Sequence, residues 1–313
     1  MSVVCKSSWA SWLFAVAMLL VVATAARELR AEEDFAHEPI MPGLDVPTFV
    51  ESPATLFLWN SNRSISGGPP SRDEPLASDR PDFTESSTTV GRGVAQVELG
   101  YTFFSDVEGG VRTHSHSFPE MLWRIGMFAD WFELRVAYNA GTGLAIAQPL
   151  GTFTASGSED LYLGAKIGLT PQQGFLPEMA LVPQMTIPTG SSALSAGKFL
   201  PGLNWLYGWD ITDRLSCGGS TQMNKAVDDS GALYLEVAQS MTVGVGLTDR
   251  IGFYAEWFFL THTAAIQAQT EHYLDGGFTF SVNYDLQLDI RAGIGLSEAS
   301  DNYFAGTGLV RRF

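Results

Sequence analysis

From Gly93 to the C-terminal Phe313, apolar and polar residues alternate with a period of two in one segment after another. The segment 161–169 is the clearest: every odd position is aliphatic, whereas the even positions carry Tyr, Gly, Lys and Gly. Successive side chains of a strand point to opposite faces of the sheet, so this pattern predicts strands with one apolar and one polar face.

Twelve segments of this kind follow one another between residues 93 and 313. Many are ten to twelve residues long, which exceeds the usual strand of a soluble domain and matches what a tilted strand needs to cross a bilayer. They lie at about 96–103, 119–128, 131–139, 160–169, 178–188, 203–211, 215–223, 235–247, 251–260, 272–283, 286–296 and 302–313.

Short and long connections alternate between these segments. Tight turns are expected at 129–130, 212–213, 248–249 and 284–285. Longer polar links are expected near 105–116, 140–159, 189–201, 224–233, 261–271 and 297–301. Short turns at one end and long loops at the other are typical of an antiparallel up-and-down barrel, and an even strand count places both termini at the short-turn end.

A transmembrane β-barrel of about 12 strands explains the pattern better than a soluble β-sandwich or lipocalin-like barrel. Charges of both signs stand at mid-strand on the polar face, for example Glu98 and Arg124, which suits a hydrated lumen. The chain also ends on Phe313, and a terminal aromatic residue on an amphipathic strand is the usual signal for the outer-membrane barrel assembly machinery. We therefore expect a bacterial outer-membrane protein in contact with outer-membrane lipids, with both termini in the periplasm.

The N-terminal third differs from the rest. Residues 1–26 are expected to be a signal peptide, with Lys6 before an apolar core and Ala23-Thr24-Ala25 as the cleavage signal; the alternative is a transmembrane anchor. Residues 27–92 hold eight of the 15 prolines and an acidic run, and are expected to form an extended periplasmic segment. The barrel then occupies 93–313.

Charge and cysteine content exclude some classes of protein. The net charge of −16 argues against a nucleic-acid partner, because phosphate binding needs a basic surface. Cys5 would leave with the signal peptide, so Cys217 would have no partner for an internal disulfide.

No motif of a hydrolase, metalloprotease or nucleotide-binding loop occurs, so we expect no catalytic residue, no metal and no cofactor. His114 and His116 fall in the first long link, where solvated side chains are the simpler interpretation. His262 and His272 flank another link and are close enough in sequence to reach each other. Tyr273, near a strand end, fits either an interfacial aromatic girdle or ordinary strand packing.

The polar face is the best candidate for function, because it would line the lumen. Unpaired acids there would favour cations; acids and bases that pair across strands would instead narrow or close the lumen. The candidate lumen-lining residues are Glu98, Glu120, Arg124, Glu133, Arg135, Asp160, Lys166, Glu178, Glu256, Asp275, Asp289 and Arg291.

A charged motif precedes the first strand. We expect it to plug the periplasmic mouth by pairing with arginines of the lumen. The candidate plug residues are Asp79, Arg80, Asp82, Phe83 and Glu85.

This motif, Ser-Asp-Arg-Pro-Asp-Phe-Thr-Glu at 78–85, resembles the start of the family named for the MetA pathway of phenol degradation. The resemblance continues through 96–101, 133–135, 160–166, 187–190, 254–256, 272–277 and 287–289. Members of that family are outer-membrane, transporter-like proteins, so the resemblance implies a barrel that passes hydrophobic or aromatic compounds.

Three functions follow as expectations. The first is a porin-like passive transporter of small solutes, with hydrophobic or aromatic compounds among them. The second is a structural or anchoring barrel without transport, whose acidic N-terminal segment binds periplasmic partners. The third is a barrel-embedded lipid hydrolase, for which no outward Ser–His pair stands out at mid-strand.

Overall fold

The computed structural model describes residues 55–57, 69–108, 111–148, 151–228, 230–263 and 269–313. The chain divides into two units, 1–50 and 51–313, and all described residues belong to the second. The expected signal peptide and most of the proline-rich segment lie outside the described residues. A helix of the length and apolarity needed to cross a membrane is not found in the described part of the chain.

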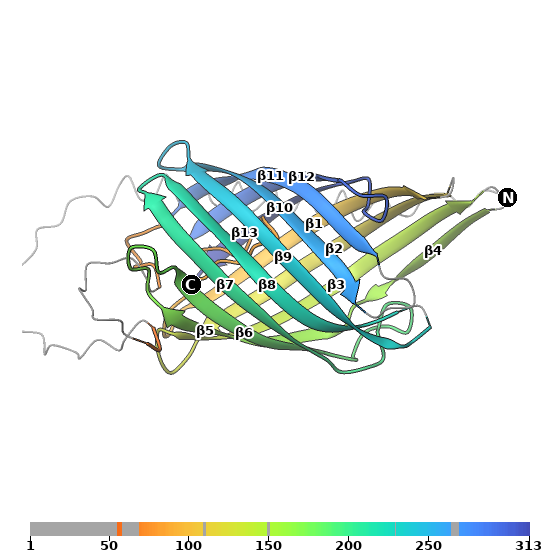
Figure 1. Cartoon of the computed structure of the whole chain (residues 1–313), viewed down its shortest axis with the longest axis horizontal. Helices are drawn as coiled ribbons and strands as arrows, with labels where there is room; N and C mark the ends of the chain where they lie inside the picture. The colour runs from red at the N-terminus through yellow and green to blue at the C-terminus, as the bar shows by residue number, and fades with distance from the viewer. Residues whose placement is uncertain (1–54, 58–68, 109–110, 149–150, 229, 264–268) are drawn as a thin grey trace, which may run out of the picture. The chain divides into compact units, whose positions relative to one another are not determined.

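Antiparallel strands make up nearly all of the regular structure (Figure 1). They are β1 (Ala95–Glu108), β2 (Val111–Gly126), β3 (Phe132–Gln148), β4 (Gly151–Ser158), β5 (Leu161–Thr170), β6 (Glu178–Ile187), β7 (Leu200–Thr212), β8 (Leu215–Val227), β9 (Leu233–Gly246), β10 (Ile251–Thr263), β11 (Thr270–Asn283), β12 (Leu286–Gly295) and β13 (Tyr303–Arg312).

These strands close into a ring. Each strand pairs with its neighbour in sequence, except β4 and β5, and β13 returns to pair with β1 from Gln96↔Arg312 to Ser105↔Tyr303. β3 pairs with β5 along its first half and with β4 along its second half, so β4 and β5 follow one another beside β3. The described strands therefore form a closed barrel with twelve positions around it, as the sequence predicts.

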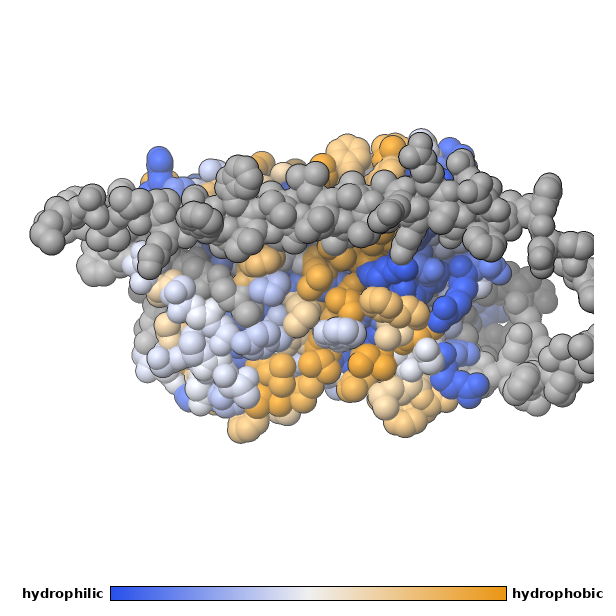
Figure 2. Space-filling model, turned by 180° about the vertical axis from the view of Figure 1, so that it is seen from behind, coloured by the Kyte–Doolittle hydropathy of each residue, from blue (hydrophilic) through white to orange (hydrophobic). Residues whose placement is uncertain are grey.

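β10 shows why this sequence folds with its polar face inward. Ile251, Phe253 and Trp257 are exposed on its outer face, whereas Glu256 and Phe258 on the same strand are buried inside. Figure 2 shows an apolar band across the visible face, between more hydrophilic ends. Large apolar side chains on the outside and buried charges inside are the arrangement of a barrel that faces lipid.

The tight turns occur where the sequence predicts them, for example between Asn283 and Leu286. The first two long links are different, because strands occupy most of their length. β1 ends at Glu108 and β2 begins at Val111; β3 ends at Gln148 and β4 begins at Gly151. The predicted loops at 105–116 and 140–159 are therefore wrong. In 105–116 polar residues occur at both parities, so the backbone ladder continues where the period-two signal has ended. In 151–158 Thr and Ser alternate with Gly, Phe and Ala, so a strand signal is present in β4.

The assignment of faces can be tested on two adjacent residues of β11. Phe278 is exposed on the outer face and Thr279 lines the interior. We expect Phe278→Arg to lower the free energy of unfolding by about 2–4 kcal/mol in lipid vesicles, because it places a charge in hydrocarbon. Thr279→Arg should have a much smaller effect. Reversible denaturant unfolding in vesicles measures both; equal losses would contradict the assignment.

Candidate functional site

The chain immediately before β1 lies inside the barrel. We call residues 76–93 the lumen segment. It begins near the turn between β11 and β12, where the Leu76 N–H donates to the Tyr284 carbonyl at 3.0 Å. It ends near the turn between β2 and β3, where the Gly93 N–H donates to the Gly126 carbonyl at 3.0 Å. Both ends of the lumen segment are thus held at the short-turn end of the barrel.

Between these ends, the segment folds into a loop closed by Asp79. The Asp79 carboxylate accepts a hydrogen bond from the Ser86 N–H at 3.0 Å, seven residues further on. The Ser78 hydroxyl accepts one from the Arg80 N–H at 2.9 Å. Short Asp and Ser side chains often bond to nearby backbone in this way, which stabilises a loop without helix or strand.

Three buried cations of the barrel wall surround Asp79. Lys166 Nζ lies 2.8 Å and Arg124 Nη1 lies 3.3 Å from Asp79 Oδ1, and Arg135 pairs with Oδ2. Burial alone would raise the pKa of Asp79, but the positive charges of Arg124, Arg135 and Lys166 outweigh it and hold that pKa well below its usual range. Asp79 is therefore ionised throughout the physiological pH range.

Acids of the wall complete this cluster. Arg124 also pairs with Glu133 at 2.7 Å and with Glu98 at 3.2 Å. Glu98 in turn accepts the Asp79 N–H at 3.1 Å, and Glu133 accepts the Val90 N–H at 2.9 Å. The wall acids thus bind both the wall cations and the backbone of the lumen segment.

Arg80, the next residue, carries a positive charge and pairs with acids of the wall. Its guanidinium pairs with Glu120 of β2 at 3.1 Å and with Asp289 of β12 at 3.3 Å. It also donates to the Thr307 carbonyl of β13 at 3.3 Å. Two adjacent residues of the lumen segment, Asp79 and Arg80, therefore each pair with wall residues of the opposite charge.

The tip of the loop, residues 81–84, reaches β9, β10 and β12, and the next residue, Glu85, pairs with Arg135 of β3 at 2.9 Å. Glu256 accepts the N–H groups of Phe83 and Thr84 at 2.6 and 2.8 Å, and the Thr84 hydroxyl lies 2.6 Å from that of Ser240. Arg291 donates to the Pro81 carbonyl at 2.9 Å. The tip is thus bound by hydrogen bonds to wall side chains on three strands.

Most of the predicted lumen residues meet the lumen segment. Asp275 instead accepts a hydrogen bond from the Tyr254 hydroxyl at 3.1 Å, and Asp160 accepts the Gly190 and Ala196 N–H groups at 3.0 Å, so it holds the link after β6. Those that contact the segment directly are Glu98, Glu120, Arg124, Glu133, Arg135, Lys166, Glu178, Glu256, Asp289 and Arg291.

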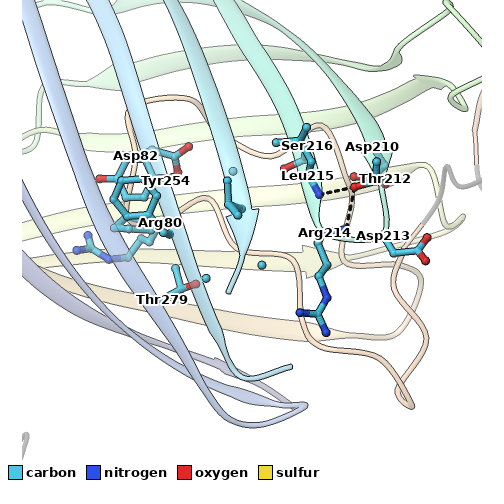
Figure 3. A pocket seen from close by; sticks show the side chains of 16 residues that line it. Arg80, Asp82, Asp210, Thr212, Asp213, Arg214, Leu215, Ser216, Tyr254 and Thr279 are labelled. Atoms are coloured by element: carbon cyan, nitrogen blue, oxygen red, sulfur yellow. Dashed lines mark hydrogen bonds between the residues drawn. The ribbon is translucent and has the colours of Figure 1, made fainter. Parts of the chain in front are cut away.

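A cavity of about 320 Å³ remains beside the lumen segment at the short-turn end (Figure 3). Arg80, Asp82 and Tyr254 lie on one side of it, and the turn after β7 with Arg214 and Ser216 lies on the other. Gly244, Gly246 and Gly252 contribute no side chains to this wall. The segment therefore does not fill the whole cross-section here.

Sequence reasoning missed an aromatic cluster inside the barrel. Phe258, Tyr273 and Phe304 pack together from β10, β11 and β13, with Phe83 and Phe104 against them. Tyr273 therefore does not belong to an outer girdle, because its ring is buried in the lumen. The sequence did hold a signal for this cluster: Phe258, Tyr273 and Phe304 are aromatic residues at strand positions whose neighbours on the same face are mostly polar.

The histidines also lie elsewhere than predicted. His114 and His116 belong to β2, where Phe103 packs against both rings at 5.4 and 5.1 Å, so they are not solvated loop residues. His262 lies near Glu236 at 3.6 Å, whereas His272 stacks on Trp257, which faces outward. His262 and His272 thus have separate surroundings. Within the described residues, no group of three His, Cys, Asp or Glu residues is arranged to hold a metal.

A protein-family model described as "Putative MetA-pathway of phenol degradation" matches residues 78–313. The chain belongs to this family. The match begins at Ser78, so the family pattern includes the tip of the lumen segment as well as all the strands. No match is found among curated protein sequences.

Several solved outer-membrane barrels are similar to this member of the family. The COG4313 outer membrane channel from Pseudomonas putida F1 is 15% identical, over 75% of this chain and 99% of that chain, with a TM-score of 0.56. The KdgM porin in complex with disordered oligogalacturonate is 10% identical, over 69% and 99%, with a TM-score of 0.44. The translocator domain of the autotransporter NalP from Neisseria meningitidis is 12% identical, over 70% and 87%, with a TM-score of 0.46. At 15% identity and a TM-score of 0.56, the COG4313 channel shares the fold of this chain.

The surroundings of Asp82 predict how pH affects the tip. Burial, with Glu256 and Asp275 nearby, raises the pKa of Asp82 well above its ordinary value. When the tip is released, that pKa returns to about 3.9. The penalty for docking an ionised Asp82 therefore grows as pH rises above about 3.9, so acidification favours the docked tip. Asp79, whose pKa is lowered, contributes equally at pH 5 and pH 8.

A nitroxide attached at Ser87→Cys, in a Cys217→Ser background, measures this effect. We expect the mobile fraction of the spectrum to fall between pH 8 and pH 5. Adding Asp82→Asn should weaken the dependence on pH. A mobile fraction that rises on acidification, or a dependence on pH that is as steep in the Asn variant as in the parent, would contradict the assignment to Asp82.

Proposed function

We propose that the protein is a porin-like outer-membrane barrel that passes small solutes passively, with the lumen segment as its plug in the resting state. The apolar outer face, the closed strand ring and the membership of the family support the membrane barrel. The fold shared with an outer membrane channel supports transport. We propose no catalytic residue and no cofactor.

The observation that carries the proposal is the chemistry of the contacts between segment and wall. They are ion pairs and hydrogen bonds, at Asp79, Arg80 and Glu256 among others. A buried ion pair gains little over separate hydrated ions, since desolvation offsets most of its attraction. Contacts of this kind hold a definite position, and water that enters the lumen when the segment moves can solvate the partners it leaves, which suits a plug that moves.

The route for solutes would begin at the cavity beside Arg80 and Tyr254. We place both termini, and with them the short turns and this cavity, at the periplasmic end. Hydrophobic or aromatic compounds are the proposed solutes, on the basis of the family's description. The acids and bases of the lumen are largely paired, so the closed state offers few free charges to attract ions.

The last strand would carry the signal for the outer-membrane assembly machinery. Phe313 is 58% exposed, and its N–H donates to the Ala95 carbonyl at 2.8 Å, next to the pairing of β13 with β1. Its side chain is therefore accessible at the point where the barrel closes. Outer-membrane lipids would cover the apolar band.

Locking the tip to the wall tests whether it must move. The Thr84 and Ser240 hydroxyl oxygens are 2.6 Å apart, so Thr84→Cys with Ser240→Cys places two sulfurs within bonding reach. In a Cys217→Ser background, we expect the oxidised protein to lose channel events in planar bilayers and a reductant to restore them. Thr84→Cys alone is the matched control. Equal conductance in oxidised and reduced protein would refute the moving plug.

Removing the plug should have the opposite effect. We expect deletion of residues 27–85 to raise single-channel conductance and to speed the swelling of liposomes in neutral and phenolic solutes. Unchanged conductance, with the deleted protein correctly assembled, would exclude the plug. Absence of channel events in every variant at any voltage would favour a structural or anchoring barrel.

A further inference from the structure

The ring of Phe83 lies in an aromatic pocket of the wall. It stacks on Phe258 with 4.4 Å between ring centroids and 2° between planes. Behind it, Phe258 stacks on Tyr273 at 4.9 Å and 19°. Three rings therefore lie nearly parallel, and the outermost belongs to the lumen segment.

The pocket is built by the strands. Tyr273 meets Phe304 edge-on at 6.1 Å, and Phe304 meets Phe104 at 5.8 Å. Phe258, Tyr273 and Phe304 are each less than a tenth exposed. We call Phe104, Phe258, Tyr273 and Phe304 the aromatic pocket; they come from β1, β10, β11 and β13.

The pocket stands out from its surroundings because the neighbouring inward positions are charged. On β10 and β11, Glu256 and Asp275 lie two residues from Phe258 and Tyr273. The contacts of the lumen segment near this point are hydrogen bonds of its backbone to Glu256, whereas the side chain of Phe83 contacts aromatic carbon. An aromatic pair of this kind contributes about 0.5–1.5 kcal/mol beyond the area it buries.

We propose that the aromatic pocket is a binding site for the planar ring of an aromatic solute, and that Phe83 occupies it as an internal competitor. A solute ring that stacks on Phe258 takes the place of the Phe83 ring. The tip then loses its apolar contact and is held by hydrogen bonds to Glu256 and Arg291. The gating part of this inference rests on the proposed function; the binding site does not.

Two consequences follow from this competition. A saturated ring of equal size lacks the π-system that favours offset stacking on Phe258, so it should bind less well than an aromatic one. Because linkage is reciprocal, a solute that binds better when Phe83 is out must also shift the tip toward release. Aromatic solutes would therefore favour the open state.

The experiment uses 4-fluorophenol and 4-fluorocyclohexanol as matched probes, observed by fluorine NMR with the full-length mature protein in detergent. In the wild type we expect weak binding of 4-fluorophenol. Phe83→Ala should tighten it by about tenfold, because the competing ring is gone and the pocket is free at all times. Phe258→Leu combined with Phe83→Ala should abolish the gain. Phe278→Leu, which alters an outward ring, is the matched control for partition into the micelle.

Three results would overturn the binding site: equal affinity for the two probes, no gain in Phe83→Ala, or retention of the gain in the double variant. Conductance in planar bilayers separates this failure from that of the proposed function. If 4-fluorophenol raises the open probability of the wild type but not of Phe83→Ala, both ideas stand. If binding behaves as expected but deletion of 27–85 leaves conductance unchanged, the site stands and the plug does not.

Discussion

Three buried positive charges inside the barrel create a requirement that the strands do not meet alone. Arg124, Arg135 and Lys166 lie on neighbouring strands, where like charges repel and burial removes the screening of water. Glu98 and Glu133 neutralise part of this charge, and Asp79 bonds to all three cations. The lumen segment is thus an electrostatic component of the wall, and its path through the barrel follows from where its counter-charges lie.

The segment is held by two kinds of chemistry at two places. Near the turn-rich end it is held by ion pairs, in which Asp79 contacts β2, β3 and β5 and Arg80 contacts β2 and β12. At the tip, hydrogen bonds to Glu256 are combined with stacking of Phe83. Buried ion pairs respond to changes in the charge of their partners, whereas stacking responds to the shape and π-system of a competing ring. The ion-paired part of the lumen segment and its tip are therefore sensitive to different changes in their surroundings.

Much of the barrel could be predicted from period two alone, because the lipid-facing side must be apolar at every second residue. The ring of twelve, the inward charges and turns such as that at Tyr284 follow from that rule. The rule gives no strand signal where polar residues fill both parities, as in the outer half of β1 and the start of β2. It also says nothing about partners across the lumen, so it could not reveal that Tyr273 and Phe258 form one cluster with a residue before the first strand.

The lumen segment is attached to the barrel at both of its ends, at Leu76 and at Gly93. A tip displaced from the lumen therefore stays within reach of its site, and its return is an intramolecular step. The local concentration of the tip is set by the length of the loop and not by the amount of protein in the membrane. Closing would then be a first-order process with the same rate in a sparse or a crowded membrane, so each barrel would reset independently of its neighbours.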